Sequence, residues 1–232
     1  MIRARILSSA ITVLAGLGLG WAPVSAALAQ TMARPAAAPA PDYEITGFRG
    51  ARFGMTPAQV RAAVAADFGA AAKVTEASNP AEGTQALQVT VEHLDPGPGP
   101  AQVSYIFGAT SHSLAHINVV WALTGSPTAE QRAAITTAAI QLANYFQTLP
   151  NPPKATSGAT PTGPNGLLLF AAVDKQGRGV EVAADGISYQ ATATADNKRT
   201  ASPPPTGPAI LRVSYIGNVV NPDIVRIKPG SF

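Results

Sequence analysis

Every metal or nucleophile hypothesis for this sequence depends on its three histidines, because the chain contains no cysteine. His112 and His116 are four residues apart, and on a helix this spacing would place both imidazoles on one face. The residues around them predict a loop followed by a strand, so the two rings are not expected to meet. His93 falls at the end of an earlier predicted strand.

Hairpin geometry argues against a shared metal ion. A hairpin centred near residues 97 and 98 would place His93 opposite Gln102, and one centred near residue 111 would place His116 opposite Ile106. These two partners are four residues apart on one strand, which is about 13 Å at 3.3 Å per residue. We therefore expect no metal site, and no motif for a cofactor is recognisable.

A nucleophilic site would need a serine, a histidine and a carboxylate. No serine lies in a G-x-S-x-G elbow, and neighbouring Ser and His residues do not by themselves create the required geometry. We therefore predict no catalytic residues and expect a polar turn whose serines bind backbone groups. An exported hydrolase using His112 or His116 stays open as an alternative, with Ser111, Ser113 and Asp95 as its remaining candidates.

Three aromatic residues offer another kind of site. Tyr105, Phe107 and Trp121 fall on adjacent predicted strands and could form an exposed platform for a peptide or an apolar ligand. Their alternation with polar residues predicts instead that they belong to the core. A carrier for a small apolar ligand, with a pocket between sheet and helices, also stays open.

Two helices are predicted from their first turns. At residues 55–60, Thr56 and Gln59 form a capping box with Pro57 at the first helical position, and Gly69 is a plausible stop. A second helix begins at Ser126-Pro127 or at Thr128, where Thr128 and Gln131 form another box, and it ends at Pro150. The residues predicted to form its apolar face are Ile135, Ala138, Leu142, Tyr145 and Leu149.

Alternating apolar residues predict the strands. A first extended segment covers residues 43–53, and three strands follow near residues 87–91, 103–107 and 117–123 as an antiparallel meander. Pro/Gly-rich loops are expected at 95–100 and 151–165. Further strands are predicted at 167–173, 179–184, 187–193 and 210–216, with turns at 174–178 and 185–186.

These elements predict an α+β fold in which two main helices pack on one face of antiparallel sheet. The order of helix plus strands occurs twice, so a tandem duplication with halves 43–125 and 126–232 is possible. Two local similarities support it: the T-x-x-Q helix starts, and the tetrapeptide V-S-Y-I at 103–106 and again at 213–216.

The first residues predict export. Arg3 and Arg5 precede an apolar run at 6–21, and Ala27-Leu28-Ala29 fits a cleavage site, so residues 1–29 are predicted to be a signal peptide. Residues 30–42, rich in Ala and Pro, predict an extended spacer before a domain at 43–232. Without the leader the formal net charge falls from +3 to +1, and no Lys/Arg cluster remains, so nucleic acid is not expected as a partner.

The segment G-M-T-P-A-Q-V at residues 54–60 resembles the helix entry of SmpA/OmlA-type outer-membrane lipoproteins and of β-lactamase-inhibitor-protein-like domains. The resemblance covers about 15 residues. It implies helices packed on an antiparallel sheet and a function of binding other proteins. This chain has no cysteine to carry a lipid, and no functional residue is transferred from those families.

Together these features predict a soluble periplasmic or secreted protein, cleaved near Ala29, that is not inserted stably in the membrane. Its most consistent function is non-catalytic binding of another envelope protein through an exposed sheet face or edge strand. The identity of that partner and the oligomeric state do not follow from the sequence.

Overall fold

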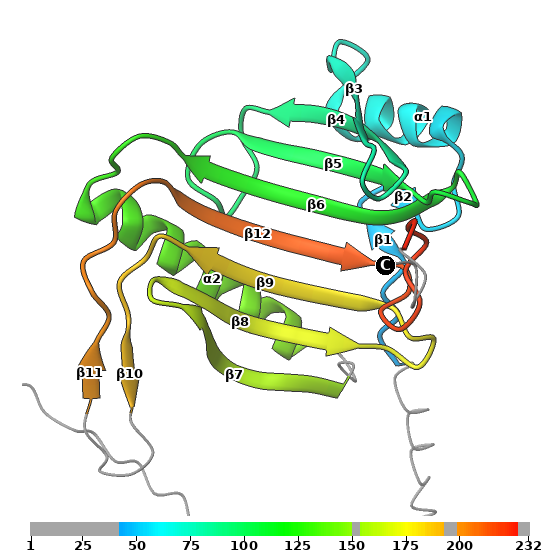
Figure 1. Ribbon diagram of the computed structural model, residues 1–232. Coiled ribbons are helices and arrows are strands. Elements are labelled where there is room, and N and C mark those ends of the chain that lie inside the picture. The colour runs from blue at the N-terminus through cyan, green and yellow to red at the C-terminus, as the bar shows by residue number, and fades with distance from the viewer. Residues whose placement is uncertain (1–41, 150–153, 193–198, 227–232) are drawn as a thin grey trace, which may run out of the picture. The chain divides into compact units, whose positions relative to one another are not determined.

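The computed structural model describes residues 42–149, 154–192 and 199–226 (Figure 1). The predicted leader at 1–29 and all of the predicted spacer except Asp42 lie outside the described residues. The described chain forms an α+β fold with two helices and antiparallel strands, as predicted. None of the helices in this part of the chain is long and apolar enough to cross a membrane.

Both helices begin where the capping boxes predict. Helix α1 spans Pro57–Phe68 and helix α2 spans Ala129–Thr148. The Thr56 hydroxyl accepts a hydrogen bond from the backbone N–H of Gln59, and the Gln59 side chain accepts one from the backbone N–H of Thr56. The equivalent reciprocal pair at the start of α2 is Thr128 and Gln131. These pairs satisfy N–H groups that the first helical turn leaves free.

The buried face of α2 differs from the prediction. Ile135 and Ala138 are buried as expected, but Tyr145 is 56% exposed and Phe146 is only 2% exposed. The helix is rotated because Phe146 stacks on Phe170, with ring centroids 5.6 Å apart, and also contacts Tyr215. Small residues complete this face, and its remaining buried apolar members are Ala139 and Ala143.

The large sheet contains eight strands in the order β3-β4-β5-β6-β12-β9-β8-β7, and each neighbouring pair is antiparallel. In chain order these strands are β3 (Val74–Asn79), β4 (Thr84–Val91), β5 (Ala101–Phe107), β6 (Leu114–Leu123), β7 (Lys154–Gly163), β8 (Gly166–Val173), β9 (Gly179–Asp185) and β12 (Ala209–Ile216).

The order of one helix and four strands occurs twice, first as α1 with β3 to β6 and then as α2 with β7, β8, β9 and β12. The two sets meet where β6 pairs with β12. The V-S-Y-I tetrapeptides do not mark equivalent places, because residues 103–106 lie in the third strand of the first set and residues 213–216 in the fourth strand of the second.

Helix α2 lies along one face of the large sheet, here called the helix-covered face, and α1 lies at the β3–β4 end (Figure 1). Phe146 of α2 packs on this face, and Arg61 of α1 forms an ion pair with Glu76, which lies opposite Leu87 on the same face. Buried residues opposite one another across five strands are Leu87, Tyr105, Ile117, Tyr215 and Val180. The other face, here called the open face, carries a polar row that consists of Gln88, Ser104, Asn118, Ser214 and Glu181.

Three segments differ from the predicted strands and loops. Residues 43–53 form only a small hairpin of β1 (Gly47–Phe48) and β2 (Ala51–Arg52). No strand was predicted at β3, and most of the predicted loop 151–165 is strand β7, because both edge strands lack a regular apolar stripe. Strand β7 forms because it pairs with β8, although the sequence of β7 has no pattern typical of a strand.

The predicted strand at 187–193 is largely wrong. Strand β12 occupies the place beside β9, so the chain after Gly186 leaves the large sheet. It forms a separate two-stranded arm of β10 (Gln190–Thr192) and β11 (Arg199–Ala201), which projects from the ends of β9 and β12 (Figure 1). Strands β4, β5, β6, β8, β9 and β12 confirm the remaining predictions.

Candidate functional site

The first hairpin does not place His93 where the sequence predicts. Gln102 lies opposite Thr90, and His93 is exposed in the loop after β4. This loop is longer than expected because Leu94 is buried on the helix-covered face. There the indole N–H of Trp121 donates a hydrogen bond to the Leu94 carbonyl at 3.0 Å. His93 is therefore removed from the strand altogether.

The second hairpin does place His116 as predicted, opposite Ile106. On its other side His116 lies opposite Ile216 of β12, so both neighbours on the open face are isoleucines. His112 is exposed in the loop between β5 and β6, where its φ is 52°. No group of three His, Asp or Glu side chains in the described residues is arranged to hold a metal ion.

The residues of the hydrolase alternative are separated. The Ser111 and Ser113 hydroxyl oxygens are 2.9 Å apart, and Ser111 Oγ also accepts from the Ser113 backbone N–H at 3.3 Å, which is the predicted polar turn. Asp95 is beyond the opposite end of β5, about 20 Å away for a strand of this length. No hydrogen bond joins either serine to a histidine within the described residues.

The three aromatic residues belong to the core, as their alternation predicts, and do not form an exposed platform. Tyr105, Phe107 and Trp121 are all less than 4% exposed and face the helix-covered side of the sheet. Phe107 reaches the end of that core and lines a pocket described below.

His116 belongs to a hydrogen-bonded chain of side chains on the open face. Its Nε2 lies 3.1 Å from Asn118 Oδ1, and Ser214 Oγ donates to the same oxygen at 2.8 Å. An amide oxygen only accepts, so Nε2 carries the proton and Nδ1 is the acceptor. Burial lowers the pKa of His116, and Arg212 lowers it further. The Asn118 hydrogen bond and Glu82 raise it in part. The ring is therefore neutral at pH 7.

A pocket of about 280 Å³ lies beside His116 at one end of the open face. Its lining is mainly apolar, and polar groups reach it from His116, Glu82 and Asp223. His116, Glu82 and Asp223 thus line one pocket, as the hydrolase alternative requires. No serine or threonine hydroxyl of the described residues forms a hydrogen bond with His116, so the nucleophile is missing. The principal apolar residues of the lining are Phe53, Ile106, Leu114, Ile216, Pro222 and Ile224.

The wall of this pocket is the C-terminal strap, residues 217–225, which crosses one end of the sheet. Three turns hold it. The Val219 N–H donates to the Gly177 carbonyl at 2.9 Å, and the Val225 N–H donates to the Glu82 carbonyl at 2.8 Å. Between them the Asp223 carbonyl accepts from the N–H of Ala109 at 3.0 Å. The strap therefore connects turns from both sets of strands.

The strongest anchor of the strap is the Asp223 carboxylate. It accepts from the backbone N–H groups of Thr110 and Ser111, both at 2.9 Å. The hydrogen bond of the Ser111 side chain, followed by those of the two backbone N–H groups, lowers the pKa of Asp223 to about 2. Sequence reasoning missed this residue because it stopped at the last predicted strand. The only local signal was the N-P-D turn at residues 221–223.

Replacing Asp223 by asparagine is expected to loosen the strap at neutral pH. The folded pKa lies below the ordinary value of about 3.9, so the carboxylate stabilises the folded protein above about pH 4. That contribution is lost as the pH falls from about 4 to 2. In D223N, exchange of the Thr110 and Ser111 amide protons at pH 7 should be about tenfold faster.

Hydrogen exchange followed by NMR, and denaturation from pH 7 to pH 2, measure this effect. The wild-type and D223N unfolding free energies should converge toward pH 2. The exposed Asp95 provides the control D95N, which should leave both amides unchanged. Equal exchange rates in wild type and D223N at pH 7 would show that the carboxylate does not hold the strap.

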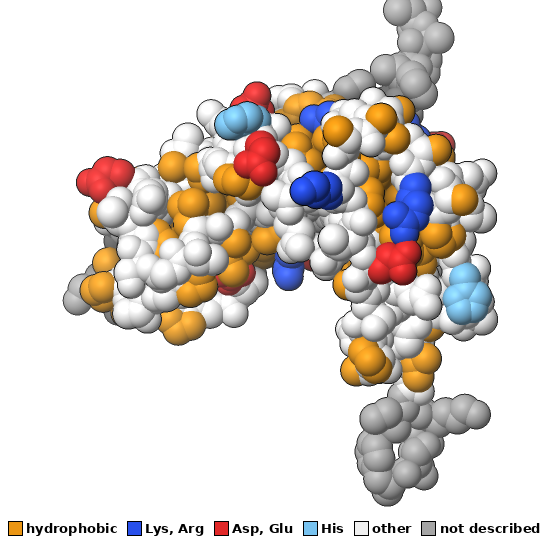
Figure 2. All heavy atoms as spheres, turned by 90° about the horizontal axis from the view of Figure 1, so that it is seen from above, with side chains coloured by type: hydrophobic (Ala, Val, Ile, Leu, Met, Phe, Trp, Pro, Cys, Tyr) orange, Lys and Arg blue, Asp and Glu red, His pale blue; other side chains and the backbone are white. Residues whose placement is uncertain are grey.

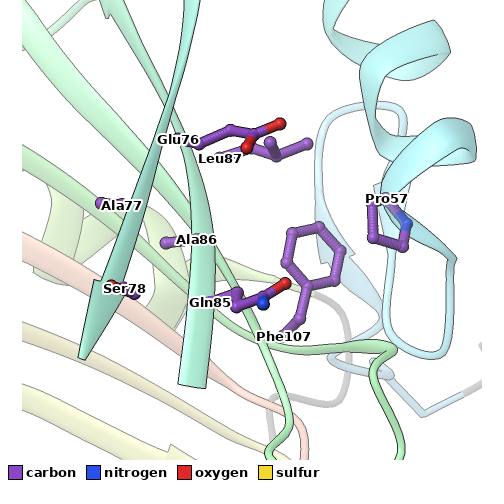
Figure 3. Close-up of a pocket in the computed structure, with 8 residues that line it drawn as sticks. All are labelled: Pro57, Glu76, Ala77, Ser78, Gln85, Ala86, Leu87 and Phe107. Carbon is purple, nitrogen blue, oxygen red and sulfur yellow. The ribbon is translucent and has the colours of Figure 1, made fainter. Parts of the chain in front are cut away.

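A second pocket, of about 270 Å³, opens between the first turn of α1 and strands β3 and β4. Figure 3 shows the side chains of Glu76, Leu87 and Phe107 on the side of Pro57, while Ala77 and Ala86 point the other way. Sequence reasoning missed this pocket because it did not predict β3. Leu87 and Phe107 lie at its floor, but more of its surface is polar than apolar, and the polar residues on its lining are Glu76, Ser78 and Gln85.

No protein-family model, curated protein or solved structure matches this chain. The resemblance of residues 54–60 to SmpA/OmlA-type and β-lactamase-inhibitor-protein-like modules thus stays a prediction. In the structure these residues form the entry to α1, where the capping hydrogen bonds alone account for Thr56 and Gln59.

Proposed function

We propose that this protein is an exported, non-catalytic binding module of the cell envelope, and that strand β3 receives an extended segment of another envelope protein. The observation that supports this is the unpaired outer edge of β3. Among the described strands it pairs with β4 alone, so its outward N–H and C=O groups offer a template for strand addition.

The two edges of the large sheet differ in how well they are protected. Strand β7 contains Pro161, which cannot donate to a ladder, and its register with β8 shifts twice. Strand β3 has no proline, and its register with β4 is regular from Val74 to Asn79. Proteins protect edges that must not pair, so the regular β3 edge is the one suited to a partner.

The pocket beside β3 supports one kind of partner segment. A residue placed opposite Glu76 would project toward α1, over the apolar floor of Leu87 and Phe107. Glu76 is already paired with Arg61, so its charge does not call for a cationic side chain. The segment is therefore expected to place an uncharged aliphatic or aromatic side chain here.

The surface around β3 is sparsely charged. In Figure 2, which views the protein from the side of β3 and α1, the Lys and Arg side chains are scattered among hydrophobic and uncharged ones and form no patch. Nucleic-acid-binding surfaces instead gather Lys and Arg into patches. This pattern supports a protein partner.

Photocross-linking in the native envelope tests the location of the interface. A photoreactive side chain at Ser78 should cross-link to one partner through an apolar segment, whereas the same side chain at Thr162 on the β7 edge should not. Fractionation should find the chain outside the cytoplasm, beginning at Gln30. Equal cross-linking from both edges, or a cytoplasmic uncleaved chain, would contradict the proposal.

Filling the pocket should block the partner without unfolding the protein. Ser78 is exposed and lines the pocket, so S78W should reduce co-purification of the partner identified by cross-linking at least about tenfold. The unfolding free energy should change by no more than about 0.5 kcal/mol. The matched control is T75W, an exposed site on the other face of the same strand. Undiminished co-purification of that partner with S78W would rule out this pocket.

A further inference from the structure

We propose that the pocket beneath the C-terminal strap binds a small uncharged molecule, mainly apolar, whose single hydroxyl or N–H group donates a hydrogen bond to His116 Nδ1. This site is separate from the β3 edge and does not depend on the function proposed there. It also differs in place from a pocket between sheet and helices, because it lies at the end of the opposite face of the sheet.

The lining and size define the apolar part of the ligand. Ile106 and Ile216 flank His116 on neighbouring strands, and Ile224 and Pro222 of the strap complete the wall. The volume, about 280 Å³, is near the lower limit of about 300 Å³ for small-molecule sites. It suits a molecule with a single ring.

The ring of His116 supplies the polar contact. The chain Ser214–Asn118–His116 uses Nε2 and fixes the orientation of the ring. No hydrogen bond to Nδ1 is formed within the described residues, although the ring is largely buried. Nδ1 is not fully enclosed and stays able to accept a hydrogen bond, so a ligand that donates to it gains an interaction that a plain hydrocarbon cannot form.

The charges around His116 favour an uncharged ligand. Arg212 lies on the neighbouring strand β12, Glu82 in the turn between β3 and β4, and Asp223 on the strap. The two carboxylates disfavour an anion. The apolar walls and Arg212 disfavour a cation, since burying an unpaired charge is expensive.

Phenol and toluene are suitable probes because they differ mainly in the hydroxyl group. Titrated into the full chain, both should shift the NMR signals of Ile106, Ile216 and Ile224. In H116L the affinity for phenol should fall about tenfold, while the affinity for toluene should be unchanged or higher. The matched control, H93L at an exposed histidine, should change neither affinity.

The wild-type protein provides a second measurement that does not depend on the folding of H116L. Protonated His116 cannot accept a hydrogen bond. Because burial lowers its pKa, phenol affinity should fall only at pH values below the ordinary histidine range, while toluene affinity should fall less. An absence of shifts at the three isoleucines with both probes would overturn the proposal. So would a ratio of phenol to toluene affinity that changes neither with pH nor in H116L.

Discussion

Replacing Phe146 by alanine is expected to destabilise the protein by about 3–5 kcal/mol, the usual cost of removing a fully buried phenylalanine. Phe146 is 2% exposed, and it joins α2 to two strands by stacking on Phe170 and contacting Tyr215 edge-on. Most other buried residues on α2 are alanines, which cannot move to fill the cavity. Chemical denaturation at pH 7 measures the loss.

The adjacent residue provides the control. Tyr145 is 56% exposed, so Y145A should cost no more than about 1 kcal/mol even though its ring touches Phe146. The sequence-based face of α2 predicts the opposite ranking, because it includes Tyr145 and omits Phe146. A larger loss in Y145A than in F146A would therefore contradict the packing of α2 in the structure.

The contrast between Tyr145 and Phe146 shows which features of a helix can be predicted from its local sequence. The start of α1 was predicted to the residue, and Thr128 was one of two predicted starts for α2, since a capping box depends only on residues three apart. The rotation of α2 was not, because it depends on Phe170 and Tyr215, which come later in the chain. An alanine-rich helix also has a weak apolar stripe, so the sequence leaves its buried face poorly defined.

The strands of the large sheet likewise divide into those that local sequence predicts and those that it does not. Six strands of the large sheet carry runs or stripes of buried apolar residues, and all six were predicted. The edge strands β3 and β7 have only one neighbour and carry exposed polar residues, so their sequences resemble loops. The pocket beside β3 was therefore missed with its strand.

The candidate sites also contain parts that depend on local sequence and parts that depend on distant residues. The register that places His116 opposite Ile106 comes from one short hairpin and was predicted. The pocket beside His116 needs the C-terminal strap, whose contacts with Gly177, Glu82 and Thr110 join residues far apart in the chain. Contacts between residues so far apart leave no pattern in the local sequence, so they could not be predicted from a single sequence.

Replacing Arg132 by methionine is expected to cost about 3–5 kcal/mol, because it removes the hydrogen bonds of a nearly buried guanidinium to three backbone carbonyls. Arg132 is 9% exposed, and its guanidinium donates to the carbonyls of Pro127 at 3.2 Å, Gly186 at 2.6 Å and Gly207 at 2.7 Å. Each hydrogen bond to a charged group contributes about 1.5–3 kcal/mol. The last two carbonyls flank the segment that contains β10 and β11, so Arg132 fastens both ends of the arm to α2.

The same substitution at an exposed arginine separates this role from a general effect of charge. Arg61 pairs with Glu76 at the surface, and R61M should cost at most about 1 kcal/mol. R132K should give an intermediate loss, because one ammonium group cannot span the carbonyls of Gly186 and Gly207. Limited proteolysis should cut R132M first between residues 186 and 207. If R132M is as stable as R61M and no more sensitive there, Arg132 does not hold the arm, and the packing of Ile187 and the hydrogen bonds of Asn165 must do so.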